Sequence, residues 1–227
     1  MLAGGMGTRL RDRVPGIPKP MAPVAGRPFL EYVLHGLSDT GVSRVVLSVG
    51  YLGEVIVDHF GTSYGDLAID YCEEPAPLGT GGAIKKALPQ LGAAPFLVLN
   101  GDTCVPVDVA ALSRAQATGR PGLVMTVCEM ADVSRYGAVL VRDGRAVGLS
   151  EKGLGGPGLI NGGVYLVAPA LVDVLGALPD VFSFEKDVLA PWVRQHGAAV
   201  VRTEGPFIDI GVPADYDRAA VVLASHF

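Results

Sequence analysis

The amino-acid sequence predicts an α/β fold built on a doubly wound, mixed β-sheet. Continuous hydrophobic runs, typical of buried strands, alternate with segments in which apolar residues recur at helical spacing. This strand–helix–strand alternation favours parallel strands joined by right-handed crossovers. Polar, glycine-rich stretches stand next to two of the strand-like runs. In sheets of this kind ligands bind at the carboxyl ends of the strands, so the same stretches are candidates for a functional site.

The first half of the chain supplies most of the alternation. In residues 27–41 apolar side chains recur at helical spacing, Pro28 can begin a helix, and Gly41 can end it. Residues 44–50, RVVLSVG, form the continuous apolar run expected of a strand that is buried on both faces. The other elements predicted here are helices at 53–61, 79–91 and 108–119 and strands at 67–74, 94–102 and 122–129.

The second half predicts a mixed extension of the same sheet. Residues 136–152 read as two short strands around Asp143-Gly144, a dipeptide typical of tight hairpins. No Ser/Pro-rich or charged linker separates the halves, so the sequence predicts a single domain over residues 1–227. The remaining predicted elements are a strand at 159–167, a helix at 183–195, an extended segment at 198–211 and a closing helix at 213–227.

Composition and charge exclude several classes of protein. Hydrophobic residues make up 49% and charged residues 18% of the 227 residues, which is typical of a soluble globular protein. A net charge of −5 gives no general attraction for nucleic acid or anionic lipid. The chain has only three cysteines, widely spaced, and no apolar run reaches the roughly 18 residues of a membrane span. We therefore expect a cytoplasmic protein with reduced thiols, no membrane attachment and no nucleic-acid partner.

The opening stretch LAGGMGTRL predicts a site for a negatively charged ligand. Backbone amides of Gly4, Gly5 and Gly7 can point at phosphate oxygens, although the spacing fits neither a dinucleotide-binding loop nor a Walker A loop. Ten residues later, PKP places Lys19 between two prolines, which stiffen the backbone that presents its ammonium group. We expect the Lys19 side chain to be exposed in a cleft. Arg9 adds a second cation to the same region.

The stretch LAGGMGTRL…PKPM resembles the signature of the sugar-1-phosphate nucleotidyltransferases, which join a sugar 1-phosphate to a nucleoside triphosphate. The resemblance implies a Rossmann-like fold of the nucleotide-diphospho-sugar transferase type, with a nucleotide-binding half at 1–130 and a sugar-binding extension at 131–227. It implies that Arg9 and Lys19 are catalytic and neutralise phosphates. The residues that it implies for nucleotide binding are Leu2, Ala3, Gly4, Gly5, Thr8, Gly79 and Thr80.

Later motifs extend the resemblance to a metal and a sugar. NGD and FIDIG imply that Asp102 and Asp209, each at a strand end, bind Mg²⁺, which prefers carboxylate and phosphate oxygens. A lone aspartate there is more often a turn former, so the inference depends on the pair. Without the resemblance, SEK would be surface charge and FSFE a helix start. The residues implied for the sugar phosphate are Gly137, Glu151, Lys152, Asn161, Gly162 and Glu185.

Within the family the chain is most similar to the D-glycero-α-D-manno-heptose 1-phosphate guanylyltransferases. This implies GTP, or another nucleoside triphosphate, and a sugar 1-phosphate as substrates, and a homo-oligomer as the assembly. A mannose-1-phosphate guanylyltransferase, an N-acetylmuramate 1-phosphate uridylyltransferase and a catalytically inactive nucleotide-sugar-binding subunit remain alternatives. A glycosyltransferase would usually carry a D-x-D metal motif, which NGDT lacks. Family members have an apolar strand before AGG, and only Met1 and Leu2 precede it here, so we expect the natural start to lie upstream.

Overall fold

The computed structural model describes residues 1–5, 7, 10, 13–118, 122–150, 153, 155–211 and 213–224. Within it the chain forms two compact units. The predicted site residues Thr8, Arg9, Glu151 and Lys152 lie outside the described residues. The organisation of residues 1–227 as a single domain stays a prediction. The first unit comprises Met1–Pro77, Leu99–Val107 and Gly205–Phe227, and the second comprises Leu78–Val98 and Asp108–Glu204.

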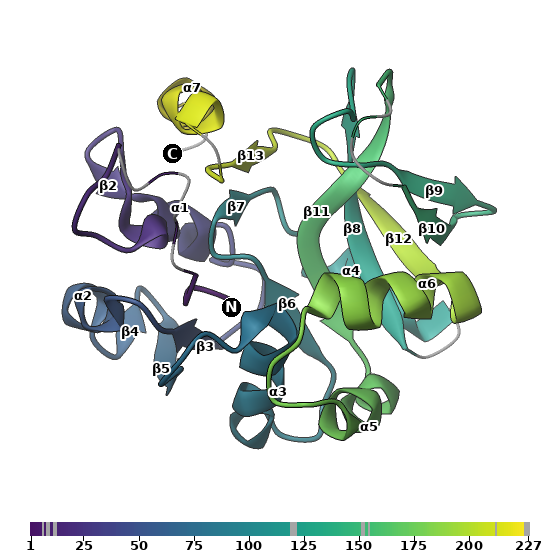
Figure 1. Cartoon of the computed structure of the whole chain (residues 1–227), viewed down its shortest axis with the longest axis horizontal. Helices are drawn as coiled ribbons and strands as arrows, with labels where there is room; N and C mark the ends of the chain where they lie inside the picture. The colour runs from purple at the N-terminus through teal and green to yellow at the C-terminus, as the bar shows by residue number, and fades with distance from the viewer. Residues whose placement is uncertain are drawn as a thin grey trace. The chain divides into compact units, whose positions relative to one another are not determined.

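The first unit contains a three-stranded sheet in the order β3-β5-β4 (Figure 1). Its strands are β3 (Arg44–Val49), β4 (Ser63–Tyr64) and β5 (Leu67–Glu73). Strand β3 runs parallel to β5, whereas β4 is antiparallel to it. The parallel pair confirms the crossover predicted for this region, in which α2 (Gly53–Phe60) leads from one strand towards the next.

The first residues of the chain extend this arrangement. Leu2 forms parallel bridges with Ser48 and with Asn100. Its amide donates to the Leu99 carbonyl at 2.8 Å, and the Ala3 amide donates to the Ser48 carbonyl at 2.8 Å. Residues 1–3 therefore act as a very short strand between the end of β3 and residues 99–101, and this strand leads directly into the glycine-rich loop.

The other elements of the first unit are short, and one differs from the prediction. Helix α1 (Phe29–His35) ends at Gly36 instead of continuing to Gly41. Beyond His35 the chain forms tighter turns, with Asp39 and Gly41 in left-handed conformations that interrupt a helix. The remaining elements are η1 (Lys19–Met21), β1 (Pro23–Val24), β2 (Arg27–Pro28), β7 (Thr103–Cys104), β13 (Ile208–Asp209) and α7 (Pro213–Leu223).

The second unit contains a six-stranded mixed sheet in the order β6-β11-β8-β12-β10-β9 (Figure 1). Strand β8 pairs parallel with β12 and antiparallel with β11. The predicted hairpin between β9 and β10 is confirmed, and both of its turn residues, Asp143 and Gly144, have positive φ, as a tight hairpin turn requires. The strands are β6 (Phe96–Leu99), β8 (Leu123–Met130), β9 (Val139–Arg142), β10 (Arg145–Leu149), β11 (Gly158–Val167) and β12 (Ala198–Thr203).

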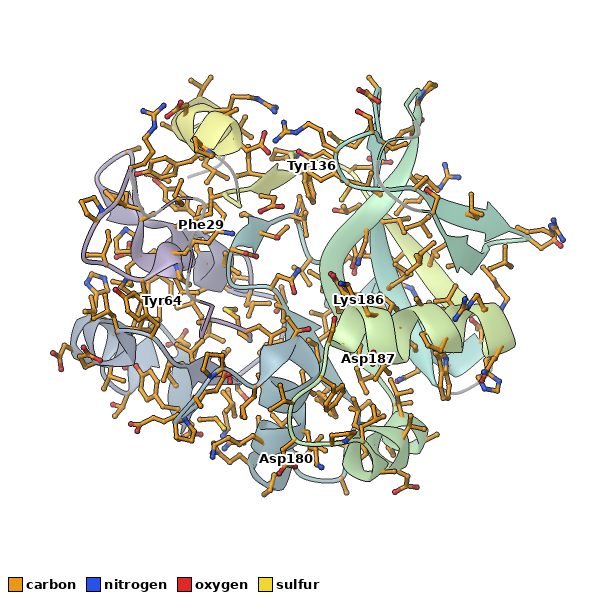
Figure 2. All side chains as sticks on the ribbon, in the orientation of Figure 1. Phe29, Tyr64, Tyr136, Asp180, Lys186 and Asp187 are labelled. Carbon is orange, nitrogen blue, oxygen red and sulfur yellow. The ribbon has the colours of Figure 1, made fainter. Side chains whose placement is uncertain are left out.

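The helices of the second unit show two differences from the prediction. Helix α5 (Pro169–Ala177) was not predicted, and the helix expected at 183–195 consists of a π-helical turn, η2 (Phe184–Leu189), followed by α6 (Ala190–His196). Lys186 and Asp187, labelled in Figure 2, belong to this turn. Ser183 caps it, because its hydroxyl accepts from the Lys186 amide. Helices α3 (Gly79–Leu91) and α4 (Val109–Thr118) match their predicted ranges closely.

Each unit has its own apolar core. Phe29, Leu47 and Ile56 are fully buried in the first unit, and Tyr165 and Phe184 are the largest fully buried side chains of the second. Cys72, Cys104 and Cys128 form no disulfide bond with one another. Among the described residues no helix is both long enough and apolar enough to cross a bilayer.

Candidate functional site

A lysine and two carboxylates meet in the first unit. The Lys19 ammonium donates to Asp102 Oδ2 at 2.6 Å and lies 3.9 Å from Asp209 Oδ1. These residues are far apart in the sequence, and the structure brings Lys19, which was predicted to neutralise phosphate, together with the two aspartates that were predicted to bind metal. Two carboxylates and one ammonium leave a net negative charge at this point, which favours a further cation.

The pairing of β7 with β13 positions the two carboxylates. Asp209 stands opposite Thr103 in this antiparallel pair, and the Ile210 amide donates to the Asp102 carbonyl at 3.0 Å. Asp209 is oriented by the Gly211 amide, which donates to its Oδ1 at 2.6 Å. The backbone therefore sets the separation of the carboxylates before any ligand is bound.

The electrostatics of Asp209 support a cation site. Burial is the main cause that raises the pKa of Asp209, and the neighbouring Asp102 carboxylate raises it further. Lys19 and the Gly211 amide lower the pKa and so partly oppose this rise. The Asp209 side chain is 34% exposed, so a ligand can reach it. Two oxygen ligands from different strands suit a hard divalent ion that completes its coordination with phosphate and water. Among the described residues no group of three or more His, Cys, Asp or Glu side chains is placed to hold a metal.

Lys19 is held more tightly than its sequence context predicts. As expected, the prolines on either side stiffen its backbone, and the short helix η1 begins at Lys19 itself. The expectation of an exposed side chain is wrong, because the Lys19 side chain is only 12% exposed. Its two carboxylate partners account for this: they draw the ammonium group inward, where charge pairing compensates for lost solvation.

The glycine-rich loop lies against Lys19. Gly7 has φ +56°, and a Cβ at this position would lie 2.9 Å from Lys19 Cβ, so only glycine allows this approach. Gly5 is exposed and has open space around it. The amides of Leu2 and Ala3 are used in the sheet, so these two predicted nucleotide residues anchor the loop instead of offering amide donors.

A glutamate supports the start of the same loop. A Cβ on Gly4 would overlap the Glu74 carboxylate, whose Oε1 accepts from the Ser48 hydroxyl at 2.9 Å. Gly50 is similarly restricted, since a Cβ there would lie 2.9 Å from the Gly4 carbonyl oxygen. Gly4 is therefore explained by close packing at the carboxyl ends of β3 and β5.

Gly79 and Thr80, predicted to face the nucleoside, make other contacts in the second unit. The amides of Gly81 and Gly82 donate to the Phe182 carbonyl, at 3.0 and 3.4 Å, and the Thr80 hydroxyl accepts from the Phe184 amide at 2.9 Å. A Cβ on any of the three glycines of this motif would overlap residues 180–182. The GTGG motif thus holds the segment that leads into η2.

A second link fastens the same segment. Lys85 of α3 donates to the Leu178 carbonyl at 2.6 Å and to Asp180 at 2.9 Å. Asp180, labelled in Figure 2, lies beside the helix, as this contact requires. The segment 178–184 is therefore held at both of its ends by α3: Lys85 binds its beginning, and residues 80–82 bind its end.

Asn161 and Gly162 lie in a bulge of β11. The register against β8 shifts between Asn161 and Tyr165, and Gly163 within the bulge has φ +72°. A Cβ on Gly162 would lie 3.1 Å from the Thr126 carbonyl oxygen, so this glycine packs closely against β8. The Asn161 side chain is partly exposed, whereas Glu185 is exposed on η2.

The segments on either side of Glu151 and Lys152 are well held. The Ser150 amide donates to the Ala138 carbonyl, and the Ala138 amide donates to the Ser150 hydroxyl, both at 2.8 Å. Gly137, which precedes Ala138, has φ +80° and is buried. On the other side, the Gly153 amide donates to the Ser134 carbonyl at 2.8 Å.

Three residues of these clusters were missed by sequence reasoning. Gly211 sits where a Cβ would lie 2.7 Å from Asp209 Oδ1 and 3.2 Å from Lys19 Nζ, and its position two residues after the aspartate in FIDIG was the available signal. Glu74 ends a predicted strand, and Tyr165 lies within INGGVYL, but nothing in the sequence distinguishes either from an ordinary surface or core residue.

The chain is similar to known proteins over nearly its full length. The model of the family described as nucleotidyl transferase matches residues 1–225. A D-glycero-alpha-D-manno-heptose 1-phosphate guanylyltransferase from Aneurinibacillus thermoaerophilus is 40% identical, covering 96% of this chain and 95% of the relative. The crystal structure of HddC from Yersinia pseudotuberculosis is 38% identical with a TM-score of 0.84, covering 97% of this chain and 96% of that one. HddC complexed with GMP-PN is 37% identical with the same TM-score and the same coverage.

These comparisons confirm the resemblance expected from the sequence and the fold class predicted with it. The match extends through the glycine-rich loop, Lys19 and both aspartates, so it includes the residues that the structure brings together. The chain belongs to the nucleotidyl transferase family.

Proposed function

We propose that this protein is a sugar-1-phosphate guanylyltransferase that joins GTP to D-glycero-α-D-manno-heptose 1-phosphate and releases pyrophosphate. The single observation that carries the proposal is the cluster of Lys19, Asp102 and Asp209 beside a glycine-rich loop. This arrangement combines a fixed cation, a pair of carboxylates and a glycine-rich backbone that a ligand can approach closely. Together they suit a nucleoside triphosphate with its metal ion.

The reaction needs little covalent participation by the protein. An oxygen of the sugar phosphate attacks the α-phosphorus of GTP in line, a new P–O bond forms, and the bond to the β-phosphate bridging oxygen breaks as pyrophosphate leaves. A phosphate monoester is largely ionised near neutral pH, so no general base is required. Catalysis then depends on orientation and on neutralising the charge of two anions that repel each other.

The first unit supplies the residues for the nucleotide. We assign the loop containing Gly4, Gly5 and Thr8 to the triphosphate, with Leu2 and Ala3 as its anchor, and Lys19 and Arg9 to neutralisation of phosphate oxygens. Lys19 is preorganised for this role, because its two carboxylate partners already hold its ammonium group in place.

The carboxylates suit a divalent metal ion. We assign Asp102 and Asp209 to Mg²⁺, because two carboxylates that share one lysine and keep a net negative charge match its preference for carboxylates and phosphates. When bound, such an ion withdraws negative charge from the phosphates. The residues of the chain meanwhile orient the site: the Gly211 amide fixes Asp209, and Lys19 fixes Asp102.

We assign the sugar phosphate to residues of the second unit: Gly137, Glu151, Lys152, Asn161, Gly162 and Glu185. Guanine and heptose are inferred from the relatives, since two similar proteins are named heptose 1-phosphate guanylyltransferases and HddC has been solved with GMP-PN. The reaction consumes GTP, and no disulfide joins the three cysteines, so we infer a cytoplasmic location. A homo-oligomer remains a prediction.

A mannose-1-phosphate guanylyltransferase is the second candidate. A mannose-1-phosphate guanyltransferase from Eremothecium gossypii is 32% identical and covers 98% of this chain, although this chain covers only 63% of that protein. Both candidates use GTP and differ in the sugar, so the sugar-binding residues decide between them.

A matrix of substrates tests the proposal. Each of the four common ribonucleoside triphosphates is incubated with Mg²⁺ and, separately, with heptose, mannose, glucose and N-acetylmuramate 1-phosphates, and products are scored by mass and by pyrophosphate release. We expect GDP-heptose as the main product. GDP-mannose as the main product would favour the second candidate. Absence of any product, with GTP still bound in calorimetry, would favour an inactive nucleotide-binding subunit.

A further inference from the structure

A continuous series of contacts in the second unit runs from α3 to the side chain of Asn161. It begins at the Thr80 hydroxyl, passes through Phe184 and Tyr165, and ends at the Asn161 amide. Only Thr80 and Asn161 were expected to face a ligand. The two aromatic residues between them have no direct part in the reaction described above.

The orientation of the Asn161 amide follows from its partners. The Gly163 amide can only donate, so the oxygen of the Asn161 side chain faces it, at 3.0 Å. The nitrogen must then point the other way, where it donates to the Tyr165 hydroxyl oxygen at 2.6 Å. One of its two protons is used in this bond, and the other remains for a different acceptor.

Tyr165 is itself rigidly placed. Its side chain is 1% exposed, and its ring meets the ring of Phe184 edge to face, with centroids 5.2 Å apart. Burial, and then the negative charge of Glu185, raise the pKa of Tyr165, so its hydroxyl stays protonated. The charge of Glu185 therefore acts at the same hydroxyl that holds Asn161.

Phe184 is fixed in turn by the start of α3. Its amide donates to the Thr80 hydroxyl at 2.9 Å, and its ring is 1% exposed. Two residues earlier, the Phe182 carbonyl accepts hydrogen bonds from the amides of Gly81 and Gly82. The GTGG motif thus positions the aromatic pair that supports Asn161.

We propose that Tyr165 is a positioning residue: its hydroxyl sets the Asn161 amide so that one amide proton is directed to the sugar 1-phosphate, and Thr80 and Phe184 hold Tyr165 in place. The inference rests on the proposed function, which assigns Asn161 to the sugar phosphate. It gives Thr80 a structural task in the sugar-binding unit, in place of the nucleoside contact that the resemblance implied.

The test replaces Tyr165 with Phe and uses Tyr32→Phe as the matched control. Tyr32 is also buried, and its hydroxyl donates to the Val24 carbonyl at 2.9 Å in the first unit. We expect Tyr165→Phe to raise the KM for the sugar 1-phosphate about 5- to 10-fold, the effect of one lost hydrogen bond. The KM for GTP should change less than about twofold, within the variation expected of an unrelated change. Tyr32→Phe should leave both KM values unchanged while lowering the melting temperature to a similar extent.

A double-mutant cycle and a spectroscopic measurement separate this role from simple destabilisation. If Tyr165 acts through Asn161, then adding Tyr165→Phe to Asn161→Ala should raise the sugar KM no further. In ¹⁵N-labelled protein the Asn161 side-chain amide signal, assigned by its loss in Asn161→Ala, should shift on Tyr165→Phe and stay in place on Tyr32→Phe. This second readout needs no activity.

Each outcome is informative. If the natural protein forms no nucleotide sugar, the proposed function fails, and the amide signal alone decides on the Tyr165 contact. Equal sugar KM values for the natural protein and Tyr165→Phe, or an unshifted amide signal, would overturn the positioning role. Should Tyr165→Phe not fold, Thr80→Val tests the other end of the series. It should raise the KM for sugar and not for GTP, Thr80→Ser should restore it, and a rise in the GTP KM instead would contradict the inference.

Discussion

The ammonium of Lys19 lies 2.6 Å from Asp102 and 3.9 Å from Asp209, with its side chain 12% exposed. The lysine therefore balances part of the charge of a carboxylate pair and is simultaneously held in one position by it. A cation that is fixed in advance loses little freedom when phosphate binds, which makes this contact the centre of the proposed site.

Replacing Lys19 with alanine should reduce kcat at least about 100-fold, because an electrostatic donor that acts on the transition state is removed. The fold should survive, since Lys19 is the first residue of the short helix η1 and its side chain is not part of the hydrophobic core. Initial rates under saturating substrates, together with circular dichroism spectra, check both parts. A kcat near that of the natural protein would contradict the role of Lys19. Lys86→Ala, which removes an exposed lysine on α3, is the control and should leave kcat unchanged.

Replacing Asp209 with asparagine should stabilise the metal-free protein near neutral pH. The pKa of Asp209 is raised in the folded state, so the folded protein binds this proton more tightly than the unfolded chain does. The free energy of unfolding of the natural protein should therefore fall as pH rises from about 4 through the raised pKa, whereas the variant lacks this decline. Urea unfolding in EDTA between pH 4 and 8 measures the difference.

With Mg²⁺ present, the natural protein should become more stable than Asp209→Asn. The ion should stabilise the natural protein above the raised pKa and stabilise Asp209→Asn much less, because one of its ligands is gone. Asp70→Asn, at an exposed ion pair with Arg44, is the control and should show neither effect. An unchanged Mg²⁺ titration of activity in Asp209→Asn would mean that Asp209 has only a structural role.

Gly211→Ala should lower activity more than stability. The added methyl group would lie 2.7 Å from Asp209 Oδ1 and 3.2 Å from Lys19 Nζ, so both groups must move away from their present positions. We expect kcat/KM to fall about 10- to 100-fold, as displacements of about 1 Å in a preorganised site do. Thermal unfolding should change little. Equal kcat/KM values for the variant and the natural protein would show that the site tolerates the displacement.

Gly81→Ala should destabilise the protein although alanine is the better helix former. A Cβ at Gly81 would overlap the Phe182 ring, and repacking a buried aromatic ring costs about 1–3 kcal/mol. Gly176→Ala in α5 is the matched control, because no atom lies within 4 Å of the Cβ built there. This control should gain up to about 1 kcal/mol from helix propensity. Denaturant midpoints measured on both variants decide whether the GTGG motif serves packing.

Much of the fold could be predicted from local patterns. Residues 44–50 form a continuous apolar run and residues 79–91 show helical spacing, and the predicted and observed ranges of both agree closely. The π-helical turn η2 could not be predicted, because it arises where Asp187 and Ser183 bond to each other and Phe184 is held by Thr80. The contact with Thr80 joins residues that are far apart in the chain, and periodicity does not register such contacts.

Part of the candidate site could likewise be predicted from the sequence, and part could not. Lys19, Asp102 and Asp209 were predicted from short motifs, and the structure places them together. The burial of Lys19 was missed because it depends on both carboxylates. The resemblance predicted a nucleoside contact for Gly79 and Thr80 of the GTGG motif. Glycines can make room either for a ligand or for a neighbouring chain segment, and in the structure those of GTGG pack against residues 180–182. Composition alone cannot separate these two uses of glycine.

The order in which the ribosome delivers these segments has a consequence for biogenesis. Leu2 and Ala3 leave the ribosome before their hydrogen-bonding partners at Ser48 and Leu99, and Asp209 follows well after Asp102. The glycine-rich loop therefore waits, unanchored, until residues 99–101 arrive, and the two carboxylates cannot meet until Asp209 has been synthesised. A nascent chain that stops before Asp209 consequently lacks the charge cluster.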